Sequence, residues 1–184
     1  MKLEEKLKEK FLKPNSNNIL KYIYFFFQKI KKNKHIRKSY SRGGIDLIVD
    51  DYFKNQKKGI YIDVGAYHPF IGNNTFKLFS RGWHGINIDL DSQSISIFNH
   101  FRPKDENICT AVSDVIEEKD LFFHHNRSAI NTLEKKLGYR AKEIKKIKTT
   151  TLNKILENSK FRDLDIDFIS IDVEGHELEV IKGL

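Results

Sequence analysis

The chain has 184 residues, of which 39% are hydrophobic and 32% charged, and its formal net charge is +8. This is enough for one real core but not for two full domains, so we expect a single domain behind an N-terminal extension. The single cysteine, Cys109, excludes an internal disulfide and is expected to be a small buried hydrophobe rather than a nucleophile. The charged start lacks the apolar core of a signal peptide, which predicts a cytoplasmic location.

Residues 1–40 are expected to form a helical, basic extension. Its apolar, aromatic run at residues 19–27 is too short to cross a bilayer, which takes roughly 20 residues. Lysines and arginines crowd residues 29–38, so two interpretations stay open: a helix docked on the core, or a helix lying on an anionic membrane surface. Basic charge without a recognised nucleic-acid motif makes nucleic acid an unexpected partner.

Residues 45–53, which follow a glycine-rich turn, have the apolar spacing of a helix. From residue 60, strand-like runs alternate with helical segments, which predicts an α/β fold with a doubly wound, mostly parallel sheet. We expect strands at 60–64, 84–89, 107–112 and 167–172, and helices near 74–81, 92–100 and 151–158 and from 177 onward. Residues 120–125 are a candidate extra strand, and the lysine-rich residues 131–147 a loop or helix over the cofactor face.

The first two strands each end in an acid, and ligands bind at this carboxyl edge of open α/β sheets. Residues 60–66 read IYIDVGA, so Asp63 ends a strand and Gly65 allows a tight turn. The further glycines of the dinucleotide fingerprint are absent, which favours a cofactor without phosphates. Asp89 ends the next strand 24 residues after Gly65, a spacing at which an acid accepts both ribose hydroxyls of an adenosine.

The last strand leads into four polar residues, Asp172, Glu174, His176 and Glu177. His176 is the expected general base because imidazole titrates near neutrality, and the alternative is a surface histidine at a helix start. Asp172 is expected to orient the base or touch the cofactor, and Glu174 to bind a substrate hydroxyl. Asp172, Glu174 and His176 are possible metal ligands in one loop, but nothing in the sequence fixes a coordination geometry, so no metal site is predicted.

Several motifs along residues 41–184 together resemble the FkbM-type S-adenosylmethionine-dependent methyltransferases: SRGG, YIDVGAYHP, NNT, RGWHGINID, RPKDEN, AVSD, TTTLNKIL and DFISIDVEGHELEVIKG. The resemblance implies a class I, Rossmann-like sheet and O-methylation of a hydroxyl on a sugar, glycan or related small molecule, as in polysaccharide biosynthesis. It also implies S-adenosylmethionine as the cofactor, bound by Asp63, Gly65, Ala66, Asn74, Thr75, Asp89, Ala111, Val112, Ser113 and Asp114. Tyr67 and Asp89 stand where relatives often have Asn and Glu.

A class I methyltransferase sheet ordinarily continues beyond the helix that starts at Glu177, whereas the chain stops at Leu184. We therefore expect residues 41–184 to be a methyltransferase domain without its C-terminal strands, in which strand 167–172 pairs with strand 60–64. The alternative function is a catalytically silent fragment that binds a membrane or a partner through its basic, aromatic N-terminus. The acceptor hydroxyl and the oligomeric state stay open.

Overall fold

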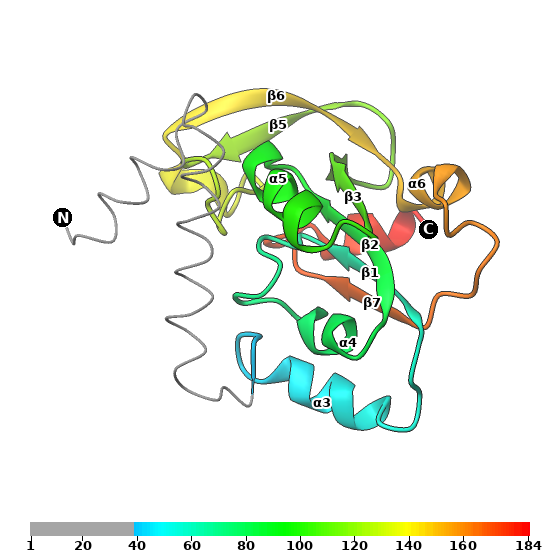
Figure 1. Cartoon of the computed structure of the whole chain (residues 1–184). Coiled ribbons are helices and arrows are strands. Elements are labelled where there is room, and N and C mark those ends of the chain that lie inside the picture. The colour runs from blue at the N-terminus through cyan, green and yellow to red at the C-terminus, as the bar shows by residue number, and fades with distance from the viewer. Residues whose placement is uncertain (1–38) are drawn as a thin grey trace. The chain divides into compact units, whose positions relative to one another are not determined.

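The computed structural model describes residues 39–184, so the expectations for the N-terminal run and its lysines lie outside the described residues. A four-stranded parallel sheet in the order β3-β2-β1-β7 forms the centre (Figure 1). Its strands are β1 (Ile60–Val64), β2 (His84–Asp89), β3 (Glu106–Cys109) and β7 (Phe168–Ile171). This is the expected α/β architecture, and the expected pairing of the last strand with β1 is confirmed.

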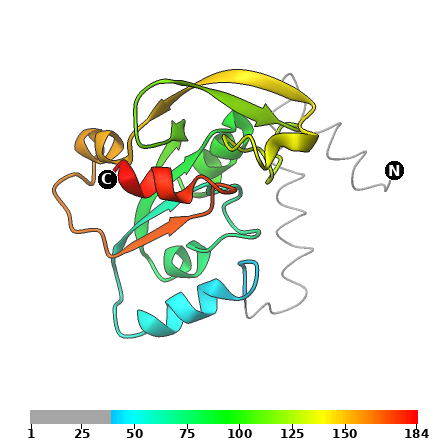
Figure 2. The ribbon, with the colours of Figure 1, turned by 180° about the vertical axis from the view of Figure 1, so that it is seen from behind.

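Helices cover both faces of this sheet. On one face Ile62 and Ile86 pack with α6 (Leu152–Asn158) and α7 (Glu177–Lys182), and Figure 2 brings α7 to the front. On the other face Tyr61 packs with α3 (Ile45–Tyr52) and α4 (Phe76–Ser80). α5 (Ser92–Phe101) connects β2 to β3. Burial of both faces explains why β1 is largely apolar, whereas β2 alternates Ile86 and Ile88 with Gly85 and Asn87, which are also buried. None of the helices in residues 39–184 is both long and apolar enough to cross a membrane.

A second sheet joins β4 (Ala111–Val112), β6 (Glu143–Thr150) and β5 (Glu118–Phe123) in that order. The expected strand at 107–112 is therefore wrong as a single element, because β3 pairs with β2 whereas β4 pairs with β6. The expected loop or helix at 131–147 is also wrong for its last residues, which belong to β6. β6 is rich in lysine, and carboxylates of β5 offset part of that charge, as in the 2.7 Å pair of Lys146 with Asp120.

The two outer strands of the central sheet bear on separate expectations. Cys109 is exposed at the end of β3, so the expected burial is wrong: β3 is an edge strand and its last residue has only a partial cover. β7 is the other edge strand within residues 39–184. Whether further strands continue the sheet beside β7 stays a prediction.

Candidate functional site

A cavity lies at the carboxyl ends of β1 and β2, with about 910 Å³ of empty space when the part open to solvent is counted. Part of its wall comes from residues 124–142, which connect β5 to β6 and which we call the cover segment. The expected connection beside the cavity is thus present, but it ends at residue 142, where β6 begins, instead of residue 147. Of the expected site residues, seven line this cavity: Gly65, Asp89, Ala111, Val112, Asp172, Glu174 and His176.

The turn after β1 forms one side of the cavity. The backbone N–H groups of Gly65 and Ala66 both donate to the carbonyl of Ile88, at 2.9 and 3.0 Å, so the chain curls beneath the end of β2. Gly65 has φ of +77°, and a Cβ atom there would lie 2.0 Å from the carbonyl oxygen of Asp172. The position therefore requires glycine because the loop after β7 passes so closely.

Asp89 lies at the end of β2 and lines the cavity, as expected. One carboxylate oxygen accepts from the backbone N–H of Tyr67 and the other from that of Asp91, both at 2.8 Å. The pKa of Asp89 is raised to about 6, mainly by burial. The two hydrogen bonds lower it, and the charges of Asp91 and Asp63 raise it. Each oxygen keeps a lone pair, so the carboxylate can accept additional hydrogen bonds from a ligand.

Apolar side chains form the wall beside Asp89. Ile88, Leu90, Ala111 and Val112 line the cavity there, which suits a flat, weakly polar group such as a nucleobase.

Ser113 and Asp114 were expected in the same wall, but neither lines the cavity. Ser113 is fully buried and donates its hydroxyl proton to Asp114 Oδ1 at 2.9 Å. The chain turns away from the cavity after Val112 because β4 pairs with β6.

Asp63 and Thr75 also lie outside the cavity lining, contrary to their expected position beside the cofactor. Asp63 is 3% exposed, and one of its carboxylate oxygens accepts from Asn73 Nδ2 at 2.9 Å and from Thr75 Oγ1 at 2.8 Å. Burial raises the pKa of Asp63, and the charge of Arg102 opposes that rise. Asn74, another expected cofactor residue, instead donates to Ser170 Oγ at 3.0 Å.

Arg102 organises this buried polar region, and the sequence analysis did not single it out. It is fully buried directly after α5, and its guanidinium donates to Asn73 Oδ1 at 2.8 Å and Thr75 Oγ1 at 2.9 Å, and also to the carbonyl of Pro69. It therefore holds the β1–α4 loop behind the cavity. The only sequence signal was its place in the RPKDEN motif, because arginine is ordinarily exposed and gives no periodic pattern.

The loop after β7 brings two acids to the cavity, Asp172 and Glu174. Glu174 has φ of +54°, and burial and then the charge of Asp172 raise its pKa, whereas the charge of Arg42 opposes the rise. Within residues 39–184, three non-glycine residues have positive φ, namely Glu174, Tyr67 and Arg127, and all three line the cavity. Such strained backbone conformations concentrate at functional sites.

His176 lines the cavity, but other side chains occupy both of its ring nitrogens. Its side chain is only 4% exposed. Nε2 lies 2.9 Å from Ser113 Oγ, and Nδ1 lies 2.7 Å from Glu134 Oε1. Because both ring nitrogens already have partners, the geometry does not favour the expected general-base role, and it also departs from the alternative of a surface histidine.

Comparisons with known proteins agree with this arrangement. A family model described as the methyltransferase FkbM domain matches residues 63–184, about two thirds of the chain. We found no significant match among curated proteins or among solved structures. The matched residues run from the strand-end acid of β1 through the cavity-lining loop after β7 to α7. The chain therefore belongs to the FkbM methyltransferase domain family.

Proposed function

We propose that this protein is an S-adenosylmethionine-dependent O-methyltransferase that acts on a hydroxyl of a sugar, glycan or related small molecule. The observation that carries the proposal is Asp89, an acid at the end of β2 that lines a cavity and keeps lone pairs available. Family membership supports methyl transfer, and S-adenosylmethionine is the usual donor in methyltransferases.

The residues around the cavity fit an adenosine-containing cofactor. Asp89 would accept the hydrogen bonds of the ribose hydroxyls, and the apolar side chains of Ala111 and Val112 would flank the adenine. The glycine turn at Gly65 would allow a close approach of the cofactor to the backbone. Asp63 and Thr75 support this wall from behind rather than through direct contact.

S-adenosylmethionine supplies a methyl group that its positively charged sulfur already activates. The chain's own residues then need to orient the acceptor hydroxyl, exclude water and take up a proton. Orientation of this kind contributes roughly 7 to 11 kcal/mol. Asp172 and Glu174 both line the cavity, and we assign proton uptake to Glu174, because burial and the charge of Asp172 raise its pKa. Asp172 would orient the acceptor.

Isothermal titration of the full chain with S-adenosylmethionine tests the cofactor assignment. We expect one binding site per chain and weaker binding after Asp89→Asn. A folded protein that does not bind S-adenosylmethionine would contradict the proposal.

A pair of variants tests the assignment of the base once a screen with labelled cofactor has found an accepted hydroxyl compound. Glu174→Gln should lower the methylation rate about 10²–10⁴-fold and leave cofactor affinity nearly unchanged. Glu157→Gln, a change on the exposed face of α6, is the matched control and should have no effect. If Glu174→Gln keeps the normal rate while His176→Ala loses it, the base is His176, as the sequence predicted.

The alternative function, a silent fragment that binds a membrane or partner, depends on the basic residues before Ser39. They lie outside the described residues, and no observation on residues 39–184 favours this alternative. The cytoplasmic location and contact with anionic lipid therefore stay predictions.

A further inference from the structure

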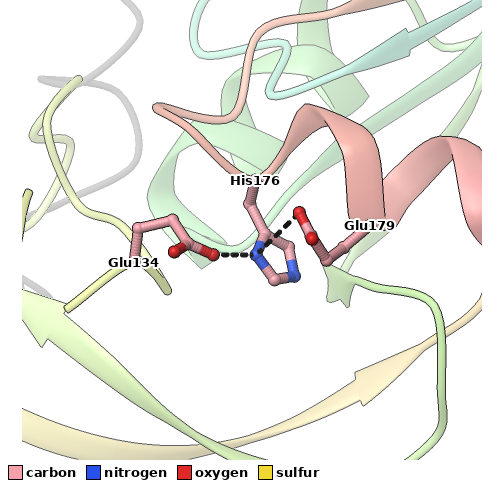
Figure 3. A group of neighbouring side chains, drawn as sticks. All are labelled: Glu134, His176 and Glu179. Atoms are coloured by element: carbon pink, nitrogen blue, oxygen red, sulfur yellow. Dashed lines mark hydrogen bonds and ion pairs between the residues drawn. The ribbon is translucent and has the colours of Figure 1, made fainter. Parts of the chain in front are cut away.

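Glu134, His176 and Glu179 form a cluster beside the cavity (Figure 3). Glu134 belongs to the cover segment, whereas His176 and Glu179 lie three residues apart at the start of α7. His176 Nδ1 is 2.7 Å from Glu134 Oε1 and 3.8 Å from Glu179 Oε2. One ligand atom from each residue lies within 4.8 Å of the others, so the three side chains converge on one point.

The hydrogen bonds around His176 determine which ring nitrogen faces this point. The hydroxyl of Ser113 donates its only proton to Asp114 Oδ1, so Ser113 Oγ is left to accept a hydrogen bond from His176 Nε2–H. Nδ1 then faces two carboxylates, and ionised carboxylates only accept. A cation between Nδ1 and the two carboxylates would then complete the cluster.

Within residues 39–184, no lysine or arginine forms an ion pair with Glu134, and the lysine that pairs with Glu179 leaves this point open. Lys182 reaches Glu179 at 3.9 Å through Oε1, which leaves Oε2 directed at His176. Glu134 and Glu179 have side chains that are 34% and 27% exposed, whereas His176 is 4% exposed. An ion can thus enter from the solvent side between the two carboxylates and meet a buried nitrogen.

We propose that Glu134, His176 and Glu179 bind a divalent transition-metal ion. One imidazole nitrogen with two carboxylate oxygens suits Zn²⁺ or Mn²⁺, whereas Mg²⁺ and Ca²⁺ prefer oxygen ligands alone. The hydrogen bond from Nε2 to Ser113 is the outer contact that metal-bound histidines usually make, and it fixes the tautomer that ligation requires. This ligand set shares only His176 with the possible ligands in the sequence analysis, because Asp172 and Glu174 line the cavity instead.

The ion would fasten the cover segment to α7. Two other contacts already join these regions: Thr132 Oγ1 donates to the carbonyl of Glu174 at 2.8 Å, and Leu137 packs over Gly175 so closely that a Cβ atom there would lie 2.5 Å from it. A metal at Glu134 adds a third and stronger link. The site therefore goes beyond methyl transfer, because its role is to keep the cavity covered rather than to touch the reacting atoms.

Titration of the metal-free full chain with Zn²⁺, and separately with Mn²⁺, tests the site. We expect one strong Zn²⁺ site, weakened at least 10-fold by Glu134→Gln and by Glu179→Gln. Glu157→Gln removes an equivalent charge from α6 and should leave the affinity unchanged. Ser113→Ala, which removes the outer contact of His176, should weaken Zn²⁺ binding about 10–100-fold. Circular dichroism of each metal-free variant checks that it is folded.

The chain contains seven histidines, so Zn²⁺ binding without the variants does not decide the question. Equal affinity in the wild type and both glutamine variants, or no binding at all, overturns the site. Amide hydrogen exchange of the wild type tests, without any variant, whether the ion fastens the cover segment to α7. Zn²⁺ should slow the exchange in residues 128–137. Unchanged exchange at saturating Zn²⁺ overturns the clamping role.

Discussion

Asp63 and Asp89 end neighbouring parallel strands, and burial raises the pKa of both, yet their surroundings differ. Asp63 alternates with Ile62 and Val64, so the pleat directs it to the same face as Tyr61, where side-chain donors surround it. Within residues 39–184, Asp89 accepts hydrogen bonds from two backbone N–H groups and from no side chain, and it lines the cavity. A strand-end acid therefore indicates a ligand contact only where side chains of the same protein do not already satisfy it.

The largest expected effect concerns the buried side of this comparison. Arg102→Leu removes the cation beside Asp63 and should lower the free energy of unfolding by about 3–5 kcal/mol, the cost of an uncompensated buried charge. Chemical denaturation measures it. Arg162→Leu is the matched control, because that side chain is 63% exposed and should change stability by less than about 0.5 kcal/mol. Equal stability of the two variants would show that Arg102 is dispensable for the network.

The next effect concerns the cavity side. Asp89→Asn should weaken S-adenosylmethionine binding by about 1.5–3 kcal/mol, the range for hydrogen bonds to a charged group. It should also lower the free energy of unfolding by about 1–3 kcal/mol, because the amide nitrogen of asparagine cannot accept the hydrogen bond that one of the two backbone N–H groups donates to the carboxylate. Isothermal titration and denaturation of the same variant separate the two effects. Asp163→Asn, on an exposed side chain, should change neither.

These two acids also show what the sequence predicts and what it does not. The strands of the central sheet follow from local apolar runs, and the cavity-lining position of Asp89 follows because parallel strands end at a common edge. The pairing of β7 with β1 was expected from the resemblance to class I methyltransferases. The buried network around Asp63 includes Arg102, which shares the partners Asn73 and Thr75 with it but is distant in the chain and carries no local pattern. Likewise, the divided strand at Cys109 and the strand character of β6 depend on partners that only the fold supplies.

A smaller effect should appear with pH. The pKa of Asp89 is raised to about 6, so its carboxylate is ionised above that pH and protonated below it. Only the ionised form accepts both ribose hydroxyls, so cofactor affinity should be steady above pH 7 and fall by up to about tenfold per unit below pH 6. The free energy of unfolding should instead rise as the pH falls through about 6, because protonation of Asp89 then removes a buried charge from the folded state. Binding isotherms between pH 5 and 8 measure the affinity, and Asp89→Asn should abolish this dependence.

The smallest effect connects Asp91, just beyond Asp89, to the cover segment. Asp91 Oδ1 caps α5 by accepting from the N–H groups of Gln93 and Ser94, and Oδ2 accepts from the N–H of Arg127 at 2.8 Å. Asp91→Ala should therefore lower the free energy of unfolding by about 1 kcal/mol. Thr151→Ala is the matched control, because Thr151 caps α6 and should have a similar cost.

The two cap variants should differ in cofactor binding. Asp91→Ala also releases the backbone of Arg127, which lines the cavity, so it should weaken S-adenosylmethionine binding, whereas Thr151→Ala should not. Isothermal titration of both variants measures the difference. If the two lose stability alike and neither loses affinity, the cover segment is positioned independently of Asp91, and the contacts of Glu134 with His176 and of Thr132 with Glu174 would be sufficient to hold it.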